Sequence, residues 1–251
     1  MGALLSSFEK LAAFRTSRVK NMPSVGTRHS EGQRCEASWY KGTPQSVAQR
    51  LLGCTLVRTV AGQRCSGIIV EVEAYLAKGD PASHSARGER PSNRTMFQQY
   101  GRLYVYPIHS RYCLNVVTEP IGVGSAVLIR AIQPRQGLER MFSVRMSGNS
   151  TFSADGNSVA QLRHLTSGPA RLCEALSVDR SLDGVDLLTD ENIWLEHPAD
   201  SVRSTNWSVR MGPRIGISQG KELQLRWFVD GHQLVSGRAS DHSSGRFWTF
   251  L

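Results

Sequence analysis

The segment Ile68-Ile69-Val70-Glu71-Val72-Glu73-Ala74-Tyr75 is the most informative part of the chain. Its β-branched residues favour extended backbone, and side chains in a strand point alternately to opposite faces. Alternation predicts one face that packs in the core, made of Ile68, Val70, Val72 and Ala74. The opposite face then carries Glu71, Glu73 and Tyr75.

Packing does not require two carboxylates and an aromatic ring on one face of a central strand. The Cα atoms of Glu71 and Glu73 are expected about 7 Å apart, from two residues of strand rise. A carboxylate held among apolar groups can act as a base toward water. A solvent-facing edge of a two-sided sheet explains the same pattern without function, so alternation alone leaves both interpretations open.

Helices and hairpin-spaced strands surround this segment. Thr43-Pro44 predicts a helix start, and Gly53 predicts its end. Strands are expected at 54–60, 65–76, 102–108, 113–118, 125–132, 191–196, 212–218 and 223–229. Further helices are expected at 134–146 and from Ser167-Gly168-Pro169 onward. The pattern predicts an α+β fold, a single domain with a curved, mostly antiparallel, partly open barrel-like sheet flanked by helices.

The predicted domain spans residues 39–236. Residues 1–38 are interpreted as a flexible basic extension, 147–158 as a flexible insertion, and 237–251 as a C-terminal tail. Basic residues at 15, 18 and 20 follow a short amphipathic stretch, which is compatible with a mitochondrial presequence. Glu9 within that stretch argues against one, and a disordered tail remains the alternative.

Composition narrows the class of protein. The 251 residues are 40% hydrophobic and carry a formal net charge of +9, and nucleic acid is the commonest partner of so basic a chain. No run approaches the roughly 18 apolar residues of a membrane helix, so no membrane partner is expected. The five scattered cysteines form no Cys-x-x-Cys pair, which predicts a reducing compartment and no metal.

Basic and aromatic side chains coincide in the long polar segment between the predicted strands. Within 78–112 there are six cations, namely Lys78, Arg87, Arg90, Arg94, Arg102 and Arg111. The same stretch contains Tyr100, Tyr104 and Tyr106. Cations for phosphates beside rings for bases suit a nucleic-acid surface, although a solvated arginine-rich loop has the same composition.

Three further side chains are candidates for a site. His84 follows the strand end, where loops often carry function, but alone it fits an ordinary surface histidine. Asn115 interrupts an apolar run and must be hydrogen-bonded if buried. Arg130 ends another apolar run and requires a carboxylate or phosphate partner, which an ordinary structural salt bridge also satisfies.

Eight short motifs occur in a fixed order along the chain: Leu52-Gly53, Val70-Glu71-Val72-Glu73-Ala74-Tyr75, Ala82-Ser83-His84-Ser85, Arg94-Thr95-Met96-Phe97, Leu103-Tyr104-Val105-Tyr106, Cys113-Leu114-Asn115-Val116, Val127-Leu128-Ile129-Arg130-Ala131 and Thr166-Ser167-Gly168-Pro169. In this order they resemble the alkyladenine (3-methyladenine) DNA glycosylase family, also called methylpurine-DNA glycosylases. The resemblance runs from about Trp39 to Val229. Helix-hairpin-helix glycosylases are a poor match, because no such hairpin with a following catalytic aspartate is present.

The resemblance implies a monomeric hydrolase that acts on double-stranded DNA without metal or organic cofactor. It implies a nuclear DNA repair enzyme that flips 3-methyladenine, 7-methylguanine or hypoxanthine out of the duplex and starts base excision repair. No lysine lies in the motifs, which favours a monofunctional N-glycosylase over a Schiff-base lyase.

The resemblance also implies roles for single residues. Glu73 would deprotonate the attacking water, and Arg130 would help to position both. The extruded base would stack on Tyr75, with His84 and Tyr106 on its other face. Asn115 would disfavour guanine at the edge that carries the 2-amino group.

The chain departs from the family after Tyr106. The family pattern continues with a turn of the type Ile-Tyr-Gly-Met, whose tyrosine fills the gap left by the flipped base. Here the sequence reads Pro107-Ile108-His109-Ser110-Arg111-Tyr112, one residue shorter and without the turn glycine. His109 or Arg111 is the candidate DNA wedge.

Two other functions remain open. A non-catalytic damaged-DNA binding protein would explain the altered wedge segment. A hydrolase that uses the Glu71/Glu73 pair on another glycoside is compatible with the spacing of the carboxylates, but the basic surface fits a small nucleoside poorly.

Overall fold

The computed structural model describes residues 32–146, 158–203, 207–242 and 246–249. They belong to one compact unit, Gly32–Leu251. Most of the predicted N-terminal extension and the predicted insertion lie outside the described residues.

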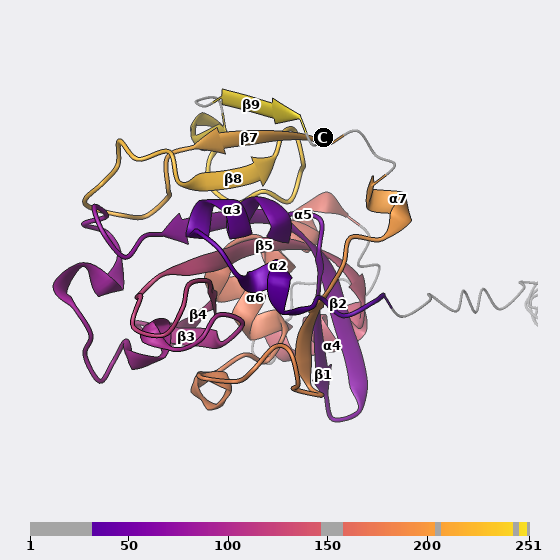
Figure 1. The fold of residues 1–251 in the computed structure, drawn as a ribbon. Coiled ribbons are helices and arrows are strands. Elements are labelled where there is room, and N and C mark those ends of the chain that lie inside the picture. Colours follow the sequence, from indigo (N-terminus) through magenta and orange to yellow (C-terminus); the bar gives the residue numbers. More distant parts are fainter. Residues whose placement is uncertain (1–31, 147–157, 204–206, 243–245, 250–251) are drawn as a thin grey trace, which may run out of the picture. The chain divides into compact units, whose positions relative to one another are not determined.

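The described residues form one nine-stranded sheet in which neighbouring strands pair antiparallel. The strands follow the order β3-β4-β5-β2-β8-β7-β9, and β1 joins β2 to β6. Their bounds are Thr55–Val60 (β1), Gln63–Tyr75 (β2), Leu103–Ile108 (β3), Arg111–Val117 (β4), Ala126–Gln136 (β5), Ile193–Glu196 (β6), Ser208–Gly212 (β7), Arg226–Val229 (β8) and Arg246–Thr249 (β9). The sheet curls into a half-barrel (Figure 1), which confirms the predicted α+β fold class.

Six α-helices accompany the sheet in the described part of the chain. They are Ala37–Tyr40 (α2), Pro44–Leu51 (α3), Leu138–Met146 (α4), Val159–Thr166 (α5), Pro169–Ala175 (α6) and Asp200–Arg203 (α7). The α3 helix begins as predicted, with Pro44 in its first turn and the Thr43 side chain accepting from Ser46 N at 3.3 Å. Helices α4, α5 and α6 pack on one another, and α6 also packs on β4 and β5.

Strand β2 lies in the middle of the sheet. It pairs with β5 along one side, and with β1 and then β8 along the other. The pairing with β5 skips Val70, so a β-bulge separates Ile69 from Glu71. Ile69 and Val72 therefore both reach the main core, whereas Val70 packs in a separate small cluster.

This bulge corrects the simple alternation expected from Ile68 to Tyr75. Val72 and Ala74 pack in the main core, as predicted. Before them the alternation of inward and outward side chains shifts by one residue, because Val70 has no partner in β5. Glu71 and Glu73 are both fully buried. The alternative interpretation, in which these two carboxylates face solvent at the edge of a sheet, is therefore wrong.

Two other predicted elements need correction. Residues 134–136 continue β5, and helix α4 begins only at Leu138, because Pro134 lies at a register shift where its missing N–H is tolerated. The strand expected at 212–218 is instead β7, which ends at Gly212. Pro213 and the positive φ of Gly216 at 77° interrupt extended backbone there, so residues 213–220 form a loop.

The C-terminal part of the chain also differs from the expected outline. Strand β9 pairs with β7, and a short 3-10 helix, η4, covers Ala239–His242. Both elements fall in the segment interpreted as a tail. Among the described residues, none of the helices has the length and apolar character needed to span a membrane.

Candidate active site

A cavity of about 1150 Å³ opens beside the end of β2. Its lining comes from three parts of the chain: the loop that follows β2, the β3–β4 hairpin with Leu128 of β5, and residues 216–219. The loop after β2 contains two 3-10 turns, η1 (His84–Arg87) and η2 (Arg94–Phe97). The long polar segment predicted between strands therefore forms one wall of the cavity.

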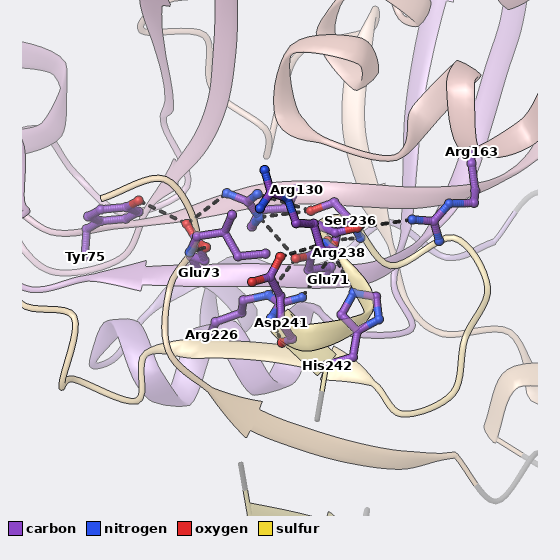
Figure 2. Close-up of polar contacts among 12 residues, drawn as sticks. Glu71, Glu73, Tyr75, Arg130, Arg163, Arg226, Ser236, Arg238, Asp241 and His242 are labelled. Carbon is purple, nitrogen blue, oxygen red and sulfur yellow. Dashed lines mark hydrogen bonds and ion pairs between the residues drawn. The ribbon is translucent and has the colours of Figure 1, made fainter. Parts of the chain in front are cut away.

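Glu73 does not line this cavity but contacts Tyr75, which does; Figure 2 shows the contact between the two side chains. Its Oε2 accepts from the Tyr75 hydroxyl at 3.0 Å and lies 3.2 Å from Nη1 of Arg130. Its Oε1 accepts from the backbone N–H of Ile215 at 2.8 Å. The carboxylate is fully buried, and Tyr75 stands between it and the cavity.

Glu71 has a different set of partners. Its Oε1 accepts from Nε of Arg226 at 2.7 Å and from Nε of Arg130 at 3.1 Å, while Oε2 accepts from Ser236 N at 2.7 Å. Burial raises the pKa of Glu71, but the two guanidiniums and Ser236 outweigh burial and leave it below its usual range. Glu71 is therefore held ionised within the protein, and it is not among the residues that line the described cavity.

Arg130 joins the two carboxylates. The prediction that this arginine needs a buried anionic partner is met twice, by Glu71 and Glu73. Burial lowers the pKa of Arg130, but Glu73 and Glu71 raise it more, so the guanidinium stays charged. The pair and its bridging cation lie on one face of β2, as strand alternation from Glu71 to Tyr75 predicts.

Three predicted aromatic residues lie in the cavity lining. The rings of His84 and Tyr106 contact each other with centroids 4.0 Å apart, and Nδ1 of His84 is 2.9 Å from the Tyr104 hydroxyl. Burial of the packed side of His84 lowers its pKa, which favours the neutral imidazole. Burial, followed by Glu73, raises the pKa of Tyr75, so its hydroxyl stays protonated.

The back of the Tyr75 ring is covered by a residue that the sequence patterns did not indicate. The guanidinium carbon of Arg214 lies 4.6 Å from the centre of that ring. Arg214 also forms a buried bidentate ion pair with Asp80, at 2.7 and 2.6 Å. Asp80 in turn accepts from Leu76 N and Ala82 N, so this ion pair fixes both the ring and the loop that follows it.

Asn115 is buried and lines the cavity. Its Nδ2 donates to the carbonyls of Tyr104 at 2.9 Å and Cys113 at 3.3 Å. These bonds meet the need for a partner that the sequence predicts for a buried amide, and they fix the orientation of the side chain. Its Oδ1 has no hydrogen bond among the described residues.

The β3–β4 hairpin closes without the turn glycine. Ile108 pairs with Arg111, so His109 and Ser110 form the tip, and His109 takes the positive φ of 53° that glycine would adopt more easily. His109 is exposed, whereas Nε of Arg111 is held 3.1 Å from Glu174 of α6. The two candidate wedge residues are thus placed differently.

The six cations of the basic segment also divide into two groups. Arg94, Arg102 and Arg111 form ion pairs with Glu89, Asp186 and Glu174. Lys78, Arg87 and Arg90 are exposed in the cavity lining, and none of these three forms an ion pair with a described residue. Lys78 is a lysine in the cavity lining that the motifs did not include.

Four functional candidates come from parts of the chain that motif reasoning passed over: Arg214, Ile215, Arg226 and Ser236. Pro213, Gly216 and Gly220 are the signal that a loop, rather than a strand, follows β7. A charged residue between Leu225 and Trp227 signals a buried ion pair in β8. Nothing in the local sequence around Ser236 indicates that it contacts Glu71.

Several known proteins are similar to this chain in sequence. The family model of methylpurine-DNA glycosylases matches residues 38–233. A relative from Rhodopirellula baltica is 48% identical over 214 residues, which is 85% of this chain and 88% of the relative. A Bacillus thuringiensis relative is 40% identical over 79% of this chain and 97% of its own length. The names of both refer to 3-methyladenine DNA glycosylase.

A mouse protein named DNA-3-methyladenine glycosylase is 44% identical over 198 residues, covering 76% of this chain and 57% of the mouse protein. The relatives therefore include bacterial and animal proteins. The family match covers more than half of the chain and includes β2, the three parts of the chain that line the cavity, and Arg130. The chain belongs to the methylpurine-DNA glycosylase family, whose members are DNA repair hydrolases that remove alkylated purine bases.

Proposed function

We propose that this protein binds duplex DNA, flips 3-methyladenine, 7-methylguanine or hypoxanthine into the cavity, and hydrolyses the N-glycosidic bond with a water activated by Glu73. The observation that carries the proposal is the position of Glu73. It is a buried carboxylate, joined to Arg130, immediately behind an aromatic cavity wall. Such a carboxylate suits general-base catalysis next to a bound base.

The cavity has the composition that a flipped purine requires. A base between Tyr75 on one side and His84 with Tyr106 on the other would stack on rings, which contributes about 1–3 kcal/mol per base. A neutral His84 avoids repulsion of a cationic alkylpurine, and burial favours that form. The unpaired cations Lys78, Arg87 and Arg90 at the cavity suit contacts with DNA phosphates.

The proposed reaction uses Glu73 as the base. Its carboxylate takes a proton from water while the water oxygen attacks the sugar C1′. The bond between C1′ and the base nitrogen breaks, and its electron pair leaves with the base. The negative charge of Glu73 also stabilises the oxocarbenium-like sugar. Because Glu73 is fully buried, access of water to its carboxylate requires a local movement of the residues that cover it.

Two other roles follow from the contacts. Arg130 touches Glu73 and is suited to orient the carboxylate and the water. The amide of Asn115 is fixed in the cavity lining by its two hydrogen bonds, which suits discrimination against guanine by crowding the 2-amino group and not by hydrogen bonding to it. His109 is the better wedge candidate, because Arg111 is engaged with Glu174.

The test is a base-release assay on duplexes that each contain one lesion, run with the wild type and with Glu73→Gln. We expect wild type to release the alkylated purines and Glu73→Gln to lose at least about a hundredfold in rate while DNA binding persists. Glu196→Gln is a matched control, since Glu196 is also buried and paired with an arginine, Arg64. Release of base by Glu73→Gln at the wild-type rate would refute the mechanism.

The same assay separates the alternatives. Tight binding of lesion DNA by the wild type without base release would favour a non-catalytic binder. Activity that is indifferent to duplex DNA and to salt would favour another glycoside. Borohydride trapping tests the monofunctional assignment, because a covalent adduct lost in Lys78→Ala would identify a lyase. A fluorescent fusion with and without residues 1–38 tests the proposed nuclear or mitochondrial location.

A further inference from the structure

Ser236 makes contacts with three charged residues behind the candidate catalytic carboxylate (Figure 2). Its backbone N–H donates to Glu71, and its carbonyl accepts from Nη2 of Arg226 at 3.3 Å. Its Oγ accepts from Arg130, from Nε at 3.3 Å and from Nη2 at 3.1 Å. Ser236 is nearly inaccessible, so these contacts are not shared with bulk solvent.

These contacts fix which edge of the Arg130 guanidinium faces Glu73. Glu71 and Ser236 hold the edge formed by Nε and Nη2. Nη1, the remaining nitrogen, lies 3.2 Å from Oε2 of Glu73. A planar guanidinium bound along one edge cannot rotate away from its third partner without losing those hydrogen bonds.

The segment that carries Ser236 is itself tied to the domain at several points. The Ser236 carbonyl also accepts from His242 at 2.7 Å, and the Asp241 carbonyl accepts from Nη1 of Arg226 at 2.8 Å. Arg163 of α5 donates to the carbonyls of Gln233 and Gly237. Residues 236–242 therefore form a fixed cap over the ion pair of Glu71 and Arg226.

This cap lies outside the parts of the chain that carry the family resemblance. The family match ends at residue 233, and residues 237–242 belong to the segment that the sequence suggested to be a tail. The contacts of Ser236 instead connect the cap to Arg130 and, through it, to Glu73.

We propose that Ser236 is a positioning residue for the glycosylase reaction. Its hydroxyl holds Arg130 against Glu73, and residues 236–242 hold Ser236 in place. The proposal rests on the proposed catalytic role of Glu73. Ser236 touches neither the cavity nor the reacting atoms. Its effect is on the excision step and not on DNA binding.

Ser236→Ala removes only the hydroxyl and keeps the backbone bonds to Glu71, Arg226 and His242. We expect single-turnover base release at saturating enzyme to fall about tenfold, the order expected for a lost hydrogen bond to a charged group. The Kd for a duplex with a stable abasic-site analogue should stay within about twofold, since binding energy and the chemical step are separable. Ser236→Thr should restore most of the rate.

Ser66→Ala is the matched control. Ser66 is a similarly buried serine near the start of β2, at the end of the strand away from Glu73. Its hydroxyl donates to Gln136 at 3.1 Å. We expect its excision rate to match the wild type after correction for folded fraction by thermal melting. The proposal is overturned if Ser236→Ala excises at the wild-type rate, or if rate and Kd weaken together without recovery in Ser236→Thr. Failure of the proposed function is a separate outcome: the wild type would then release no base, or Glu73→Gln would release it at the wild-type rate.

Discussion

Glu71 and Glu73 lie two residues apart on one strand, yet they belong to two regions with opposite character. The Glu71 region consists of Glu71, Arg226, Ser236 and the Nε–Nη2 edge of Arg130, and each of these groups bonds to at least two of the others. The cavity region presents Tyr75, His84, Tyr106 and Asn115 to open space. The first region is a closed set of charges, and the second has groups left for a ligand.

Two carboxylates on one strand thus differ in their surroundings, and the difference lies in how many buried partners each has. A buried ion pair contributes little net stability, but removing one partner leaves an expensive unpaired charge. The Glu71 region therefore holds Arg130 firmly because any displacement is costly. Because Arg130 contacts both carboxylates, its fixed position also restricts the orientation of Glu73, the carboxylate next to the cavity wall.

Replacing Glu71 should have the largest effect on folding. Glu71→Gln leaves Arg226 and part of Arg130 without a buried anion, and we expect the free energy of unfolding to fall by about 3–5 kcal/mol. Urea denaturation measures this loss. Glu73→Gln should lose less stability, because Glu73 has only one arginine partner. An equal loss in the two variants would erase the distinction between the regions.

The stability contributed by Glu71 should also depend on pH. Its pKa in the folded protein lies below the ordinary value of 4.5, so its contribution is fully present above that value and is lost as the pH falls through the folded pKa. The stability difference between wild type and Glu71→Gln should thus be largest near neutral pH and shrink in acid. Denaturation curves at several pH values test this, and a difference that grows in acid would contradict it.

Substitutions of residues in the cavity region should lower kcat/KM more than they lower the free energy of unfolding. Tyr106→Ala removes a ring that contacts His84, and loss of one stacking partner of about 1–3 kcal/mol should lower kcat/KM about ten- to a hundredfold. Tyr106→Phe keeps the ring and should remain close to wild type. If the phenylalanine variant is as impaired as the alanine variant, the hydroxyl and not stacking is what matters.

Substitutions at the tip of the β3–β4 hairpin should have the smallest effects on excision. Arg111→Ala breaks an exposed ion pair with Glu174, which is worth less than about 1 kcal/mol, and excision should change by no more than about twofold. His109→Ala should weaken excision from duplex DNA more, while leaving the affinity for single-stranded DNA unchanged. A stronger effect of Arg111→Ala than of His109→Ala would identify Arg111 as the wedge.

Local sequence patterns predicted much of the sheet and part of the site. Thr43-Pro44 marks the start of α3, and the alternation from Glu71 to Tyr75 places both carboxylates and the ring on one face, as found. The ordered motifs identified the family, which the comparisons confirm. These features depend on neighbours within a few residues, so a short segment contains the information.

The tertiary structure decided the rest, because the deciding contacts join distant residues. Ile215 lies 142 positions from Glu73, and Ser236 lies 165 positions from Glu71. The bulge at Val70 exists because β2 must pair with β5 while keeping Ile69 and Val72 in the same core. The sequence by itself determined a central strand with two carboxylates on one face. Only the folded chain gave the two carboxylates different surroundings, because it places two arginines beside Glu71 and the cavity-lining Tyr75 beside Glu73.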